Sequence, residues 1–161
     1  MPEKRTFGLK SVKMGEDAGS ATVLGDGNTL EGTASFIKEE DEEKEFYAEE
    51  HDDPIETILK KGKATLEFGI VDFTPDTLVR VLGGTVDGTS GNWLAPDVAP
   101  EIEQYFEVVT KKDVKIILKR AKVKGSVDWP LSKEDLGKVT VRATVLAPTD
   151  GSKAYEFGSA V

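Results

Sequence analysis

The sequence contains no cysteine and only one histidine, His51. The lack of cysteine excludes disulfide bonds, thiolate metal sites and thiol nucleophiles, and it is typical of a protein that folds in a reducing compartment. A single histidine also excludes zinc sites that need several imidazoles. A serine triad would have to use His51, which stands among acidic residues, so this class of active site is disfavoured.

Long apolar runs are missing as well. No run approaches the ~20 residues that span a bilayer, and the opening residues Met-Pro-Glu-Lys-Arg lack the apolar core of a signal peptide. We therefore expect no membrane association. The spacings of a phosphate-binding glycine loop and of an EF-hand are absent. We predict no catalytic, cofactor-binding or metal-binding residues and no enzymatic activity, although a hydrolase using some of the 30 acids stays an alternative.

Charge is abundant and unevenly placed. The 161 residues have the length of one domain, and we predict a single domain over residues 1–161. The net charge is −9, from 30 acidic and 21 basic residues. One segment alone accounts for this charge, because it holds ten carboxylates against Lys44: Glu39, Glu40, Asp41, Glu42, Glu43, Glu45, Glu49, Glu50, Asp52 and Asp53.

A later segment is basic and holds seven cations against Asp113: Lys111, Lys112, Lys115, Lys119, Arg120, Lys122 and Lys124. Two interpretations stay open: the two segments are separate solvated surfaces, or they are complementary surfaces of neighbouring copies. The candidate inter-subunit or lumen-facing residues are Glu39, Glu40, Asp41, Glu42, Glu43, Glu45, Lys115, Lys119, Arg120, Lys122 and Lys124.

Alternation of apolar and polar residues predicts strands along most of the chain. It is clearest in residues 64–70 and 138–147 and from Val114 onward, where a change of phase near Lys119 and Arg120 indicates a β-bulge. Further strands are predicted over residues 6–13, 21–24, 32–38, 44–50, 104–110 and 154–160. The acidic stretch around Asp41 is expected to form the tip of a long hairpin, with residues 36–37 and 46–47 on its two sides.

One helix is predicted over about residues 75–83. Thr74 can cap its N-terminus, Pro75 suits the first helical position, and Gly83 ends it. So short a helix must pack against a sheet. Residues 88–100, which include Trp93, are expected to form an irregular loop. The predicted fold is therefore mainly β, a β-sandwich or barrel with one short flanking helix and a long charged hairpin.

Several segments, in this order, carry a resemblance to a known family. They are Thr-Phe-Gly-Leu-Lys at 6–10, the charged hairpin, Lys-Gly-Lys-Ala-Thr-Leu-Glu-Phe at 61–68, Thr-Pro-Asp-Thr-Leu-Val-Arg-Val-Leu-Gly-Gly at 74–84, Asn-Trp-Leu-Ala-Pro at 92–96 and Thr-Val-Leu-Ala-Pro-Thr-Asp-Gly at 144–151. Over nearly the whole chain, this order of features resembles the tail tube (major tail) proteins of long-tailed bacteriophages, which share their fold with type VI secretion tube proteins.

The resemblance implies a structural virion protein of the tail, assembled in the host cytoplasm, with no catalytic residue, cofactor or metal. Its subunits would form hexameric rings that stack into a tube, through which genomic DNA passes without specific binding. Its partners would be further copies and other tail proteins. Two alternatives stay open: a type VI secretion-like tube protein, and a small-molecule-binding β-barrel with an apolar pocket and a few polar groups.

Overall fold

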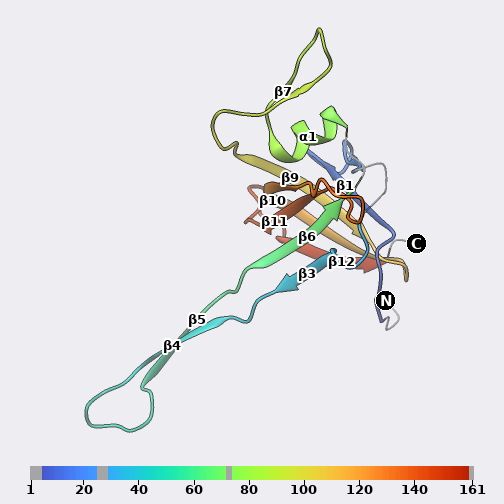
Figure 1. Cartoon of the computed structure of the whole chain (residues 1–161). Coiled ribbons are helices and arrows are strands. Elements are labelled where there is room, and N and C mark those ends of the chain that lie inside the picture. The colour runs from blue at the N-terminus through green and yellow to red at the C-terminus, as the bar shows by residue number, and fades with distance from the viewer. Residues whose placement is uncertain (1–4, 25–28, 72–73, 160–161) are drawn as a thin grey trace.

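The computed structural model describes residues 5–24, 29–71 and 74–159. In these residues the fold is mainly β, with antiparallel strands and one short helix, which confirms the predicted fold class (Figure 1). The elements are β1 (Ser11–Gly15), β2 (Thr22–Val23), β3 (Ser35–Lys38), β4 (Glu42–Phe46), β5 (Glu56–Lys60), β6 (Ala64–Ile70), α1 (Pro75–Leu82), β7 (Thr85–Val86), β8 (Trp93–Leu94), β9 (Ile102–Val109), β10 (Val114–Asp128), β11 (Lys138–Val145) and β12 (Tyr155–Ser159).

The main sheet has eight strands and is organised around the long strand β10. Its order is β2-β1-β9-β10-β11-β6-β3, and β12 pairs with the first half of β10, whereas β11 pairs with the second half. The register between β10 and β9 shifts between Leu118 and Ala121, which confirms the bulge predicted at Lys119 and Arg120. A bulge bends its strand and increases the local twist. The sheet therefore bends sharply at this point, so that its two halves face each other.

The bend creates one core between the two halves of the sheet. Phe68 of β6 and Phe106 of β9 pack with their ring centroids 6.4 Å apart, although β10 and β11 lie between them in the strand order. Val141 of β11 is fully buried in the same cluster, which also contains Leu78 and Val81 of α1. Alternation with one buried face is what makes β6 and β11 recognisable in the sequence.

The two end strands of the bent sheet approach each other through aromatic side chains. Phe36 of β3 contacts Tyr155 and Phe157 of β12, with ring centroids 5.7 and 5.8 Å apart in edge-to-face geometry. Within the described ranges no ladder joins β3 to β12. The sheet is bent but not closed, and the predicted β-sandwich or barrel is not confirmed.

Helix α1 begins and ends where the sequence predicts. The Thr74 hydroxyl accepts a hydrogen bond from the Thr77 N–H at 3.4 Å, and Gly83 follows the last turn with a φ of 77°. The helix packs closely on β10 at Gly125, where a Cβ atom would lie 2.5 Å from Leu82 Cδ2. A side chain at this position would push the helix off the sheet.

Other strand boundaries differ from the prediction. The strand predicted over residues 6–13 begins at Ser11, and the last strand is Tyr155–Ser159, while residue 160 lies outside the described part of the chain. The expected loop at 88–100 contains β8, which pairs with β7. Strand β5 was not predicted, because all five of its residues are exposed and its apolar residues therefore do not alternate.

The hairpin turns later than predicted. Lys38 lies opposite Ala64 and Glu42 opposite Lys60, so residues 35–46 and 56–67 keep one register along a single two-stranded ribbon. The turn falls within residues 47–55, and the prediction of a tip at Asp41 is wrong. The physical reason is that turn-forming residues, among them Asp-Asp-Pro at 52–54, lie at the far end. Residues 39–46 hold no glycine, proline or asparagine, and the carboxylate of their one aspartate, Asp41, accepts hydrogen bonds from Lys38 and from Gly62 on the opposite side of the ribbon.

Candidate assembly surfaces

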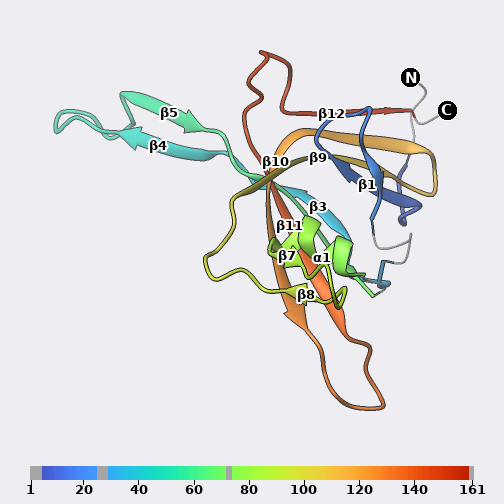
Figure 2. The ribbon, with the colours of Figure 1, turned by 90° about the horizontal axis from the view of Figure 1, so that it is seen from above.

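A long arm, here residues 39–63, projects from the body of the protein (Figures 1 and 2). Asp41 braces its base, because one carboxylate oxygen accepts hydrogen bonds from Lys38 Nζ at 2.5 Å and from the Gly62 N–H at 3.0 Å. These two contacts, with Lys38 as the larger cause, lower the pKa of Asp41. The predicted acidic candidates all lie on the outgoing side of this arm, in β4 or just before it, and are exposed: Glu39, Glu40, Asp41, Glu42, Glu43 and Glu45.

The arm also exposes large apolar side chains on both of its faces. Tyr47, Ile55 and Leu59 are 58%, 59% and 67% exposed, and Phe46 and Ile58 are 38% and 53% exposed. Strand alternation places Ile58 with Phe46 on one face and Leu59 with Ile55 on the other. Tyr47 shares the second face, since its hydroxyl bonds to Glu45. A ribbon of two strands cannot bury either face by itself, and such exposure is typical of interaction surfaces.

The basic candidates on β10 are mostly neutralised by their own chain. We call Lys115, Lys119, Arg120, Lys122 and Lys124 the basic row. Four of its members form ion pairs with neighbouring carboxylates, namely Lys115 with Glu107 (3.3 Å), Lys119 with Glu156 (3.8 Å), Arg120 with Glu103 (2.9 Å) and Lys122 with Glu101 (3.2 Å). Lys124 makes no ion pair among the described residues. Within one chain, the structure does not bring the basic row to the acidic arm.

Sequence analysis missed the carboxylates that pair with the basic row. Glu103 and Glu107 belong to β9, whose register places Glu103 opposite Lys122 and Glu107 opposite Ile117. Arg120 holds the pKa of Glu103 below its ordinary value through their hydrogen bonds. The alternation of residues 102–109 was the available signal, because it predicts an outward face that carries both glutamates.

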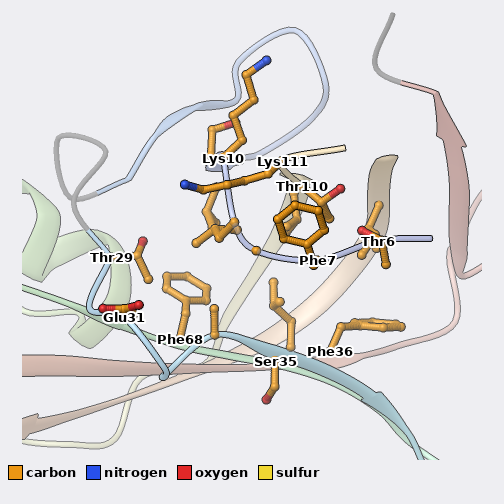
Figure 3. Close-up of a pocket in the computed structure, with 18 of the residues that line it drawn as sticks. Thr6, Phe7, Lys10, Thr29, Glu31, Ser35, Phe36, Phe68, Thr110 and Lys111 are labelled. Carbon is orange, nitrogen blue, oxygen red and sulfur yellow. The ribbon is translucent and has the colours of Figure 1, made fainter. Parts of the chain in front are cut away.

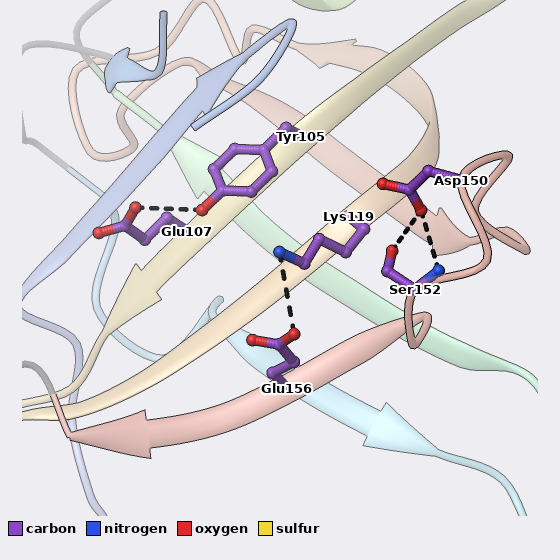
Figure 4. A network of polar contacts seen from close by, with 6 residues as sticks. All are labelled: Tyr105, Glu107, Lys119, Asp150, Ser152 and Glu156. Atoms are coloured by element: carbon purple, nitrogen blue, oxygen red, sulfur yellow. Dashed lines mark hydrogen bonds and ion pairs between the residues drawn. The ribbon is translucent and has the colours of Figure 1, made fainter. Parts of the chain in front are cut away.

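Tyr105 lies beside this paired network and is buried, with 5% of its surface exposed. Its hydroxyl donates to Glu107 Oε2 at 3.3 Å, and Figure 4 shows this contact together with the ion pair of Lys119 and Glu156. Burial, assisted by the nearby charge of Glu107, raises the pKa of Tyr105 to about 12.

The raised pKa of Tyr105 predicts a loss of stability at high pH. An unfolded tyrosine loses its proton near pH 10, whereas folded Tyr105 keeps it to about 12. The stabilisation is therefore complete below about pH 10 and is lost as pH rises towards about 12, because the unfolded state binds fewer protons there. We expect Tyr105→Phe to show a shallower fall of the unfolding free energy in urea titrations across this window. Equal slopes in the two proteins would contradict the assignment.

A cavity of about 840 Å³ opens between residues 6–12 and the edges of β3 and β12. Figure 3 shows Phe7 and Lys111 on one side of this space and Phe36 and Phe68 on the other. Its lining is largely apolar, with Lys10, Lys111 and Glu31 among its charged residues. Sequence analysis missed it, because the lining residues come from segments that are far apart in the chain.

Among the residues that the structure describes, no group of three or more histidine or carboxylate side chains is placed to hold a metal ion, and no helix has the length and apolar character needed to cross a membrane. His51 lies exposed in the turn of the arm. Comparison of the chain with protein-family models and with curated proteins finds no match.

Proposed function

We propose that this chain is a structural, self-assembling subunit of the tail tube type, which forms stacked rings. The observation that carries the proposal is the arm, a ribbon whose two strands are exposed at every residue and whose apolar side chains face water on both sides. An isolated two-stranded ribbon is marginally stable. Packing against another copy would bury its apolar side chains and stabilise it. The proposal includes a hexameric ring, a place in the virion tail and a lumen that conducts DNA without specific binding.

The outer edge of β3, which pairs with no strand among the described residues, supports the same proposal. An open strand edge presents N–H and C=O groups that pair readily with another chain. If copies associate head to tail, one contact repeats around a ring that closes, and stacked rings can extend into a filament. A type VI secretion-like tube would use the same surfaces.

The cavity favours a second candidate function, the binding of a small apolar molecule. Its volume of about 840 Å³ falls within the range of ligand pockets, and its apolar lining with a few charged groups is typical of them. If the protein is a ligand-binding protein, it should stay monomeric at high concentration. If it is a tail tube subunit, electron micrographs should show rings or tubes.

The acidic arm makes assembly sensitive to salt, and the sign of the effect depends on where the arm lies. If the arm meets a basic surface on a neighbouring copy, salt screens the attraction and weakens assembly. If the arms line a lumen, they repel one another, and salt strengthens assembly. We expect the first result, because a projecting arm is the element best placed to reach a neighbour. Sedimentation at about 50 mM and about 500 mM salt measures the sign.

A charge-neutralised variant extends this test. Changing four carboxylates at the turn of the arm to amides should weaken assembly at low salt and reduce its salt dependence: Glu49→Gln, Glu50→Gln, Asp52→Asn and Asp53→Asn. A control removes the same charge from exposed positions on the body: Glu16→Gln, Asp97→Asn, Glu134→Gln and Asp135→Asn. Better assembly of the arm variant than of the parent at low salt would contradict the contact between arm and neighbour. Monomers at every concentration would contradict the proposed function.

A further inference from the structure

The cavity between residues 6–12 and the edges of β3 and β12 leaves apolar surface uncovered in a single copy. Its floor is formed by Leu66, Phe68 and Ile116, which belong to the core, but its rim includes Phe7 and Phe157, which are 58% and 53% exposed. Protein interiors are close-packed, and an unfilled apolar space forfeits dispersion contacts. An apolar occupant would therefore be bound favourably at this place.

The rim of the cavity carries positive charge next to this apolar surface. Lys10, Lys111 and Glu31 are the charged residues that line the cavity, and the Lys112 ammonium lies 5.5 Å from the ring centroid of Phe7, so cations outnumber Glu31 here. Lys10 is paired with Asp113 at 3.0 Å, but neither Lys111 nor Lys112 forms an ion pair with any carboxylate among the described residues. In this respect the rim differs from the basic row, four of whose five cations are already paired. The rim is thus the better complement for an acidic partner.

The arm has the matching composition. Near its turn, Tyr47 and Ile55 expose apolar surface, and four carboxylates follow one another closely: Glu49, Glu50, Asp52 and Asp53. Figures 1 and 2 both place this turn far from the N-terminal segment that borders the cavity, on the other side of the molecule. The arm therefore does not fill the cavity of its own chain.

We infer that the cavity receives the end of the arm, residues 45–57, from a second copy of the chain. Apolar side chains of the arm enter the apolar space, its carboxylates meet Lys111 and Lys112, and the open edge of β3 can pair with its backbone. The two surfaces differ, so the contact is heterologous and can repeat from copy to copy. This inference rests on the proposed function and names the receiving surface within it.

Disulfide trapping tests the contact directly, because the chain has no cysteine of its own. The donor position is Thr57→Cys on the exposed arm, and the acceptor is Glu31→Cys at the cavity. Under mild oxidation the double variant should give a ladder of covalent multimers that a reducing agent collapses. The matched control combines Thr57→Cys with Lys124→Cys, the member of the basic row that has no ion pair among the described residues, and should give nothing beyond dimers.

Protection of the thiol from chemical modification is a second measurement, because it does not depend on whether the two cysteines can form a disulfide. In the assembled protein, the thiol of Glu31→Cys should be protected from maleimide, whereas that of Lys124→Cys should react as it does in the monomer. A ladder with Lys124→Cys but not with Glu31→Cys, or an unprotected Glu31→Cys thiol in sedimenting assemblies, overturns the inference and leaves the proposed function standing. A parent protein that stays monomeric overturns both. If a small apolar ligand occupied the cavity instead, the Glu31→Cys thiol would react equally in the monomer and in the assembly, or the protein would stay monomeric. Either result overturns the inference.

Discussion

Val141→Asp should leave the protein unfolded in water. Val141 is fully buried in β11, between Phe68 of β6 and Gly125 of β10. The cations nearest along these strands, Lys124 and Arg142, occupy alternate positions and point to the outer face. A carboxylate at position 141 would thus be buried without a partner, which costs several kcal/mol. The whole stability of a domain is only about 5–15 kcal/mol.

A control for this prediction adds the same charge on the outer face. Ser126 lies on β10 and is exposed, so Ser126→Asp should keep the cooperative thermal transition of the parent. Circular dichroism during heating distinguishes the two variants. If Val141→Asp melts cooperatively at the temperature of the parent, Val141 does not belong to the core, and the bent sheet described above is wrong.

Buried strands could be predicted from the sequence, and exposed ones could not. In β6, Leu66 and Phe68 alternate with polar neighbours because one face of the strand packs on the core. The bulge in β10 was visible for the same reason, since a one-residue slip changes which residues face inward. In β5, Ile58 and Leu59 are adjacent and both exposed. No buried face imposes a period there, so the strand left no alternating pattern.

The charged segments could be located from the sequence, but their pairing could not. The count of charges identified the basic row, yet its neutralisation depends on the register of β10 against β9 and β12, which brings Lys119 to Glu156. The cavity depends even more on tertiary structure, because Phe7, Phe36 and Phe157 come together only when the sheet bends. The local sequence pattern predicts which face of a strand is buried. A site formed by segments that are distant in the chain can be located only once the tertiary structure is known.

Excision of the arm should abolish assembly and leave the body folded. The Glu39 N–H donates to the Lys63 carbonyl oxygen at 2.8 Å, so these two residues can flank a two-residue hairpin turn. Replacing residues 40–62 by Asn-Gly provides the turn sequence that such a hairpin favours. No residue of 40–62 belongs to the buried core cluster. The thermal transition of the body should therefore persist, while sedimentation should show monomers at concentrations where the parent forms rings.

Two variants that keep the arm test whether its apolar side chains are what drives assembly. Ile55→Ser together with Leu59→Ser removes apolar side chains from one face of the arm, while Thr57→Ser between them on the same face serves as the control. The double variant should weaken assembly strongly, because burial of apolar area is the main attraction in such contacts, and the control should assemble like the parent. If the excised protein formed the same rings as the parent, the arm would have no role in assembly. The tail tube proposal would then lose the observation that carries it.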